Sequence, residues 1–151
     1  MAGLCACVKH LSKEEIKQLI EKSEKPEEFI KDEKLREMFQ CENEIGRSKS
    51  NAIKYLKIVE ESLQLLANPQ LMDDEERRDE FFMELMPKFE DEYIENITAS
   101  DPDEIINQRR RFLEQVLKEY TRMLGESERY GKFKEKLKKA YEGKIKIEKN
   151  P

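Results

Sequence analysis

The chain has 151 residues, of which 42% are charged and 37% hydrophobic, and its net charge is −5 at neutral pH. It has no tryptophan and only five glycines and five prolines, which excludes collagen-like and glycine-rich repeats. No apolar run approaches the roughly 20 residues of a membrane-spanning helix, and no secretory signal is visible at the N-terminus. We therefore expect a cytoplasmic protein.

Apolar residues recur at the spacing of amphipathic helices along most of the chain. This pattern predicts an all-α protein, an antiparallel bundle of about five to six helices joined by short loops. We expect one domain over residues 12–143. A flexible segment, 1–11, would precede it, and a mobile basic tail, 144–151, would follow it.

The first predicted helix begins after Ser12, with Glu15 three residues further on. This is the spacing of a capping box, and Leu11 and Ile16 occupy the two positions of a hydrophobic staple. Pro26 ends this helix, because the residue before a proline resists helical geometry. The same proline can begin the next helix at its first position.

A heptad pattern runs from Leu35 to Leu66, with polar interruptions on both sides of Gly46. Glycine weakens a helix, so we expect two helices in this stretch, the second ending before Pro69. The apolar stripe of this second helix could pair within the bundle or between chains. The partner-binding residues predicted from the stripe and from a later basic run are Leu56, Val59, Leu63, Arg109 and Arg110.

Asp73 and Asp74 can cap a third long helix that runs to about residue 99. Pro87 lies inside this helical pattern. Because proline lacks an N–H group and clashes with the preceding turn, it predicts a kink there. Asn96 lies in an N-glycosylation sequon, Asn96-Ile97-Thr98. We do not expect it to be glycosylated, because the sequence shows no secretory signal.

A fourth helix is predicted to begin at Pro102, with Asp101 as its cap. Gly125 would end it, and Gly143 would end a last, shorter helix, since glycine is the usual residue after a helix C-terminus. The remaining tail alternates in polarity like a strand but has no partner strand in the sequence.

Charge is distributed unevenly. Residues 73–104 contain fourteen acidic and three basic residues, whereas residues 129–151 contain nine basic and three acidic residues. Such asymmetry can steer a partner, or the two segments can neutralise each other. The aromatic residues of the basic segment fall on a single apolar stripe, and the chain is acidic overall, so nucleic acid is not expected as a partner.

The three cysteines and the single histidine form a set that would satisfy tetrahedral zinc. These metal candidates are Cys5, Cys7, His10 and Cys41. The Cys-x-Cys-x2-His spacing is not a standard finger spacing. Acylation of Cys5 and Cys7, giving a peripheral membrane protein, is a second interpretation. Free thiols in a reducing compartment are the third.

Residues 45–124 have the general build of a three-helix module of the kind found in adaptor proteins. Three arginines followed by Phe112 and Leu113 resemble the start of the last helix of the BAG cochaperone domain. Where that domain has a glutamine further along the helix, this chain has Leu117, so no binding residue is transferred.

The sequence shows no glycine-rich phosphate loop and no serine elbow, and 34 acidic residues make chance carboxylate pairs unavoidable. We therefore predict a non-enzymatic adaptor or regulatory module that binds a protein partner through an amphipathic helical face. A second copy of the chain is one such partner. No cofactor is expected apart from the zinc alternative.

Overall fold

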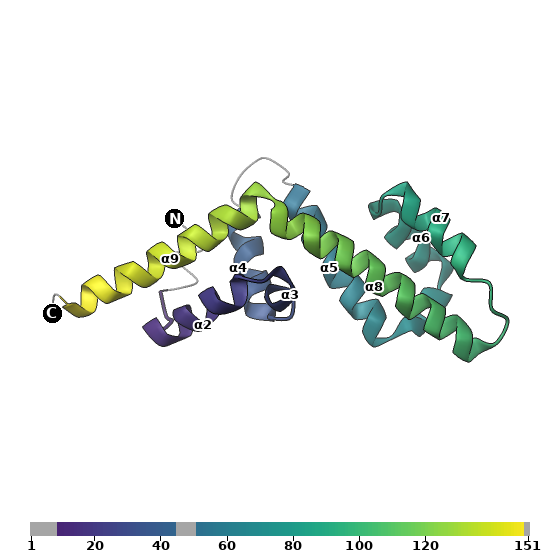
Figure 1. Cartoon of the computed structure of the whole chain (residues 1–151), viewed down its shortest axis with the longest axis horizontal. Coiled ribbons are helices and arrows are strands. Elements are labelled where there is room, and N and C mark those ends of the chain that lie inside the picture. Colours follow the sequence, from purple (N-terminus) through teal and green to yellow (C-terminus); the bar gives the residue numbers. More distant parts are fainter. Residues whose placement is uncertain (1–8, 45–50, 150–151) are drawn as a thin grey trace. The chain divides into compact units, whose positions relative to one another are not determined.

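The computed structural model describes residues 9–44 and 51–149. All regular structure in these residues is helical, which confirms the predicted all-α class (Figure 1). The α-helices are α2 (Lys13–Ser23), α3 (Pro26–Phe29), α4 (Glu33–Glu44), α5 (Asn51–Ala67), α6 (Glu75–Glu84), α7 (Pro87–Asn96), α8 (Pro102–Glu126) and α9 (Glu128–Lys149). A 3₁₀ helix, η1 (Pro69–Asp73), follows α5. None of these helices is long and apolar enough to cross a membrane.

The chain divides into two compact units. The sequence, in contrast, predicts a single domain over residues 12–143. Unit 1 comprises the chain up to Ile53 and from Arg122 onward, and it contains α2, α3, α4 and α9. Unit 2 is the continuous segment Lys54–Thr121, which contains η1, α6, α7 and most of α5 and α8.

The start of α2 forms as predicted. The Ser12 hydroxyl accepts a hydrogen bond from the Glu15 N–H at 3.1 Å, and the Glu15 carboxylate accepts one from the Ser12 N–H at 3.2 Å. Hydrogen bonds of the Glu15 carboxyl with the backbone and the side chain of Ser12 lower the pKa of Glu15. Leu11 and Ile16, the two staple residues, are both buried. Pro26 occupies the first position of α3, also as predicted.

Four buried rings from three helices form the centre of unit 1: Phe29, Phe39, Tyr130 and Phe133. The Phe29 ring meets the Tyr130 and Phe133 rings edge to face, with centroids 5.1 and 5.9 Å apart. The Tyr130 hydroxyl donates a hydrogen bond to the Ser23 carbonyl. The only polar atom of this buried side chain is therefore hydrogen-bonded. Burial raises the pKa of Tyr130, so this hydroxyl stays protonated.

Pro87 does not kink a helix as predicted; it begins one. α6 ends at Glu84, and Leu85 and Met86 have extended backbone before α7 starts at Pro87. The residue before a proline is driven out of helical geometry, so the predicted helix becomes two. The Met86 N–H donates to the Tyr120 hydroxyl at 2.9 Å, which satisfies the group that the break releases.

The helix end predicted at Gly125 lies within one residue of the observed end of α8, whereas the helix end predicted at Gly143 is wrong. α8 continues through Gly125 to Glu126, and α9 continues through Gly143 to Lys149, so most of the predicted mobile tail is helical. Neither glycine has the positive φ for which a terminal glycine is used. Gly125 has a packing role instead, because a methyl group there would overlap Cγ of Pro26.

Replacing Gly125 with alanine is expected to lower the free energy of unfolding by about 1 kcal/mol or more. Overfilling a packed site costs about 1–3 kcal/mol, which exceeds the gain in helix propensity of up to about 1 kcal/mol. Gly131 in α9 is the matched control, since a methyl group there would meet nothing within 4 Å. Urea unfolding measures both variants. Equal stabilisation by the two substitutions would contradict the packing role.

Candidate functional site

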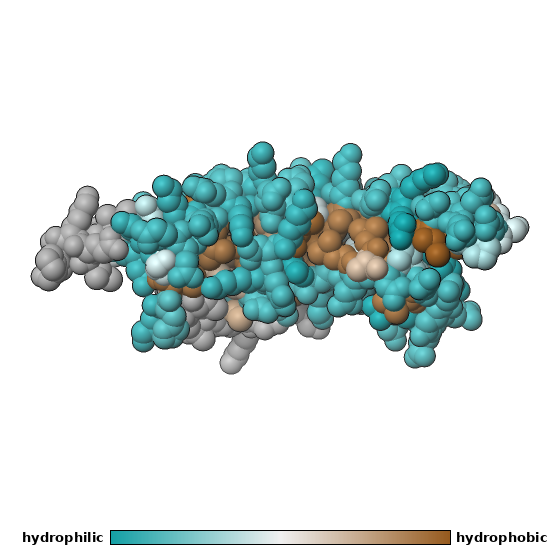
Figure 2. All heavy atoms as spheres, turned by 90° about the horizontal axis from the view of Figure 1, so that it is seen from below, coloured by the Kyte–Doolittle hydropathy of each residue, from teal (hydrophilic) through white to brown (hydrophobic). Residues whose placement is uncertain are grey.

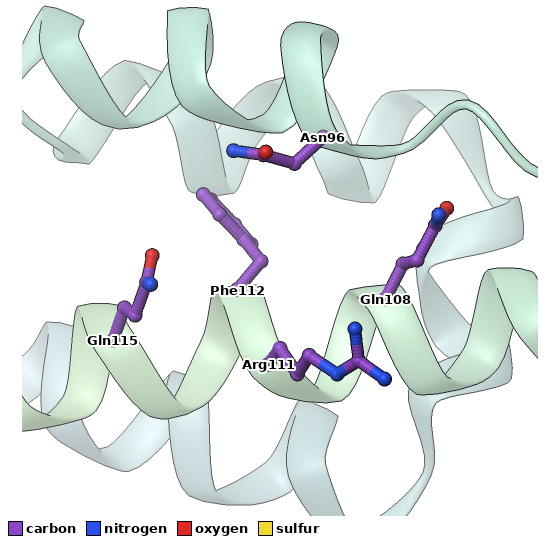
Figure 3. A pocket seen from close by; sticks show the side chains of 5 residues that line it. All are labelled: Asn96, Gln108, Arg111, Phe112 and Gln115. Carbon is purple, nitrogen blue, oxygen red and sulfur yellow. The ribbon is translucent and has the colours of Figure 1, made fainter.

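A small cavity of about 280 Å³ lies in unit 2, between the end of α7 and the middle of α8 (Figure 3). Its size is near the lower limit of ligand pockets, which are roughly 300–1,000 Å³. The lining residues are Asn96, Gln108, Arg111, Phe112 and Gln115. We call this feature the amide pocket, because three of its five side chains are carboxamides.

The lining of the amide pocket follows from helical geometry. Gln108, Arg111 and Gln115 are spaced three and four residues apart, so they form one row along α8. Asn96 reaches the pocket from α7 on the opposite side (Figure 3). The pocket therefore depends on how α7 packs against α8.

A cluster of aromatic rings gives the pocket a fixed wall. Phe112 is 3% exposed, and its ring points from α8 toward α7. Its centroid lies 5.1 Å from that of Tyr93, 6.1 Å from that of Phe82 and 6.5 Å from that of Phe89. Such edge-to-face contacts restrict the ring, so this wall is preformed.

Two of the carboxamides are partly engaged. The Gln108 Oε1 atom accepts hydrogen bonds from the Thr98 N–H at 3.1 Å and the Ala99 N–H at 3.2 Å. The Asn96 Nδ2 atom donates to the Glu92 carbonyl at 2.8 Å. Gln108 thus keeps its amide donors for a ligand, and Asn96 keeps its Oδ1 acceptor.

The other two polar side chains have no partner among the residues that the structure describes. Arg111 and Gln115 are exposed, and within the described residues neither makes a side-chain hydrogen bond or ion pair. Arg111 therefore presents a guanidinium with all its donors available at the edge of the pocket. The arrangement can bind a group that carries acceptors and at least one donor.

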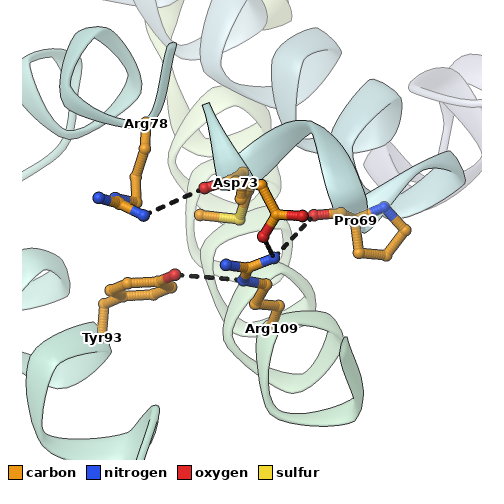
Figure 4. Close-up of polar contacts among 6 residues, drawn as sticks. Pro69, Asp73, Arg78, Tyr93 and Arg109 are labelled. Atoms are coloured by element: carbon orange, nitrogen blue, oxygen red, sulfur yellow. Dashed lines mark hydrogen bonds and ion pairs between the residues drawn. The ribbon is translucent and has the colours of Figure 1, made fainter. Parts of the chain in front are cut away.

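The neighbouring Arg109 has a different role, because it is 7% exposed (Figure 4). Its Nη1 atom donates to the Asp73 carboxylate at 2.7 Å and to the Pro69 carbonyl at 3.5 Å. Its Nε atom donates to the Tyr93 hydroxyl at 3.3 Å. One guanidinium thus joins η1, α7 and α8.

The electrostatics keep Arg109 charged. Burial lowers the pKa of Arg109, but the hydrogen bonds with Asp73 and Tyr93 outweigh it, so the net shift is upward. Asp73 is consequently an ion-pair residue, whereas Asp74 alone caps α6 by accepting from the N–H groups of Glu76 and Arg77.

The structure places most of the predicted partner-binding residues inside the chain. Leu56 and Val59 are 1% and 0% exposed, and Leu63 is half-buried. Their stripe therefore pairs within the chain, which is the internal alternative. Arg109 is a structural residue, which corrects the prediction that it contacts a partner. Arg110 is exposed, so a partner can reach it.

Half of the predicted zinc set lies outside the described residues. Cys5 and Cys7 are in the segment 1–8, whereas His10 and Cys41 are described and exposed. Within residues 9–44 and 51–149, no group of three or more His, Cys, Asp or Glu side chains is placed to hold a metal ion. Zinc binding by all four residues and acylation of the two N-terminal cysteines stay predictions.

A second cavity in unit 2, of about 250 Å³, lies between α5 and α6. Its lining residues are Glu61, Gln64, Leu65, Arg77, Glu80 and Phe81. Burial raises the pKa of Glu61, and the nearby carboxylates of Glu84 and Glu80 raise it further against the opposing charge of Arg77. Ionisation of Glu61 is therefore less favourable in the folded protein than in the unfolded chain.

Comparisons of the chain with protein-family models, with curated proteins and with solved structures find no match. The resemblance of the arginine run and Phe112 to the BAG domain therefore gains no support. The residues of the chain itself are the basis for its proposed function.

Replacing Arg109 with methionine is expected to cost about 1–3 kcal/mol of unfolding free energy, because the Pro69 carbonyl and Tyr93 hydroxyl lose a donor. Arg110→Met, on the next residue, is the control, and such a surface change stays within about 0.5 kcal/mol. Asp73→Asn should cost less than Arg109→Met, since the Asp73 side chain is 71% exposed. Urea unfolding ranks the three variants, and equal losses for Arg109 and Arg110 would refute the structural role.

Replacing Glu61 with glutamine is expected to stabilise the protein at neutral pH. A carboxyl whose pKa is raised by folding stabilises the protein below pH 4.5, the pKa of glutamate in the unfolded chain, and loses that contribution as the pH rises. The advantage of the variant over wild type should therefore vanish toward about pH 4. Thermal unfolding at a series of pH values from acidic to neutral measures this. Glu114→Gln, which removes another exposed carboxyl from the same unit, is the matched control for the loss of one negative charge.

Proposed function

We propose that this chain is a non-enzymatic interaction module, and that unit 2 binds a protein partner at the amide pocket. The observation that carries the proposal is a preformed pocket whose polar side chains have unsatisfied hydrogen-bonding groups. Arg111 and Gln115 have no partner in the described chain, and Gln108 and Asn96 each keep one free side of their carboxamide.

The chemistry of the pocket suits a polypeptide. A carboxamide carries one acceptor and two donor hydrogens, the same kinds of group that a peptide bond presents. The row from Gln108 to Gln115 rises about 10 Å along α8 at about 1.5 Å per residue. That length matches about three residues of extended chain at roughly 3.3 Å each. A short extended segment of a partner therefore fits the row.

Two further features of the surface would contribute to the binding of a partner: exposed apolar side chains and acidic charge. Figure 2 shows hydrophobic side chains at several places on an otherwise hydrophilic face. In unit 2, Met83 on α6 is 82% exposed and Ile94 on α7 is 66% exposed. Apolar contacts supply affinity at such sites, while the acidic segment 73–104 would add a contribution that salt screens.

The test is capture of a partner from native lysate by the purified protein, at low and at high salt, with identification by mass spectrometry. The captured protein is then purified, and its Kd is measured for matched double variants. Arg111→Ala with Gln115→Ala should weaken binding by about tenfold or more, since a hydrogen bond to the charged Arg111 is worth about 1.5–3 kcal/mol and one to the neutral Gln115 about 0.5–1.5 kcal/mol.

The control is Arg110→Ala with Glu114→Ala, which removes two exposed charged residues from the same helix. It should change Kd by less than about twofold, because isolated surface charges contribute little. Equal weakening by both double variants, or no partner at either salt concentration, would overturn the proposal.

A further inference from the structure

We propose that the amide pocket recognises the C-terminal carboxylate of an extended peptide. This inference rests on the proposed function and names the part of the partner that enters the pocket. Its basis is the combination of one unpaired guanidinium, flanking amide donors, one opposing acceptor and an apolar wall within a cavity of about 280 Å³.

Arg111 provides the charge. A guanidinium offers paired N–H groups in a planar fork that matches a carboxylate in a bidentate geometry. Within the described residues Arg111 makes no ion pair, in contrast to Arg109, whose charge is matched by Asp73. An anionic group at Arg111 would thus provide the ion-pair partner that the described residues do not supply.

The flanking amides place donors on one side of the pocket and an acceptor on the other. Gln108 lies one turn before Arg111 and keeps its amide hydrogens, because its Oε1 atom is bound by Thr98 and Ala99. Asn96, across the pocket on α7, keeps its Oδ1 atom, because Nδ2 donates to a carbonyl. The pocket therefore offers several donors on α8, and it offers acceptors at Asn96 on α7 and at Gln115 on α8.

A chain terminus matches this arrangement better than an acidic side chain does. At a C-terminus the carboxylate and the last peptide N–H belong to the same residue, so both can be bound within a short distance. In a glutamate the side-chain methylenes separate the carboxylate from the backbone N–H. The small volume of the pocket likewise suits the end of a chain rather than a chain that passes through it.

Phe112 predicts the character of the terminal residue. Its ring forms the apolar wall of the pocket and is held by Tyr93, Phe82 and Phe89. Contact with a ring face or edge favours an apolar side chain over a charged one. We therefore assign an apolar residue, such as leucine, to the last position of the peptide.

The experiment is a titration of the full ¹⁵N-labelled chain, followed by NMR, with three probe peptides. The probes are acetyl-Ala-Ala-Leu with a free carboxylate, the same peptide as its C-terminal amide, and acetyl-Ala-Glu-Ala amide. The first should shift the Arg111 Nε–H signal and the side-chain amide signals of Asn96, Gln108 and Gln115. The two amidated peptides should bind at least about tenfold more weakly.

Variants of adjacent arginines give the matched control. Arg111→Gln should weaken binding of the free acid by about tenfold or more, and Arg111→Lys should restore only part of it, because lysine lacks the bidentate fork. Arg110→Gln removes the same charge from the next residue and should change Kd by less than about twofold. An unchanged ¹⁵N spectrum away from the pocket shows that each variant is folded.

The outcomes separate this inference from the proposed function. Equal binding of the free acid and its amide, equal binding of the glutamate peptide, or shifts confined to other surfaces would overturn the inference. The proposed function would survive if a protein partner still depended on Arg111 and Gln115. Conversely, binding of the free acid without a pocket-dependent partner would leave the carboxylate site standing and refute the proposed function.

Discussion

The guanidinium of Arg109, on α8, is buried against groups from η1 and α7, and unit 2 is organised around it. A buried charge is tolerated only when it is paired and hydrogen-bonded. The Pro69 carbonyl, the Asp73 carboxylate and the Tyr93 hydroxyl meet this requirement, so η1 and α7 are held against α8. Tyr93 also contacts the Phe112 ring, which is the wall of the amide pocket. The pocket is therefore a consequence of the same interaction that orders the unit.

Of the three consecutive arginines on α8, one is buried and two are exposed. Successive residues of a helix point about 100° apart, so a helix with one buried face can bury one member of such a run and expose its neighbours. Arg109 faces the interior, while Arg110 and Arg111 are exposed. The interior arginine fixes the position of α8, and the exposed Arg111 is then presented at a defined place. In the proposed site, Arg109 therefore holds α8 in place, and Arg111 of the same basic run provides the group that binds the ligand.

Local signals in the sequence predicted much of the fold. The capping box at Ser12, the proline at the start of α3 and the end of α5 before Pro69 all depend on neighbours within a few residues. Features that depend on distant neighbours were missed. Gly125 is required in the last turn of α8 because Pro26 packs against it, and the break before Pro87 is stabilised by Tyr120. The amide pocket escaped prediction because ordinary Asn and Gln residues acquire meaning only once α7 and α8 are packed together.

The order of the two units along the chain has a consequence for biosynthesis. Unit 2 is continuous, whereas unit 1 is assembled from both ends of the sequence. As the chain leaves the ribosome, Phe29 and Phe39 emerge long before Tyr130 and Phe133, the rings that cover them. Unit 2 can complete its core during this interval. The Phe29 and Phe39 rings of the first helices meanwhile remain exposed, because α9 has not yet been synthesised. Nascent chains in that condition are the ones that chaperones bind and that aggregate when they are left alone.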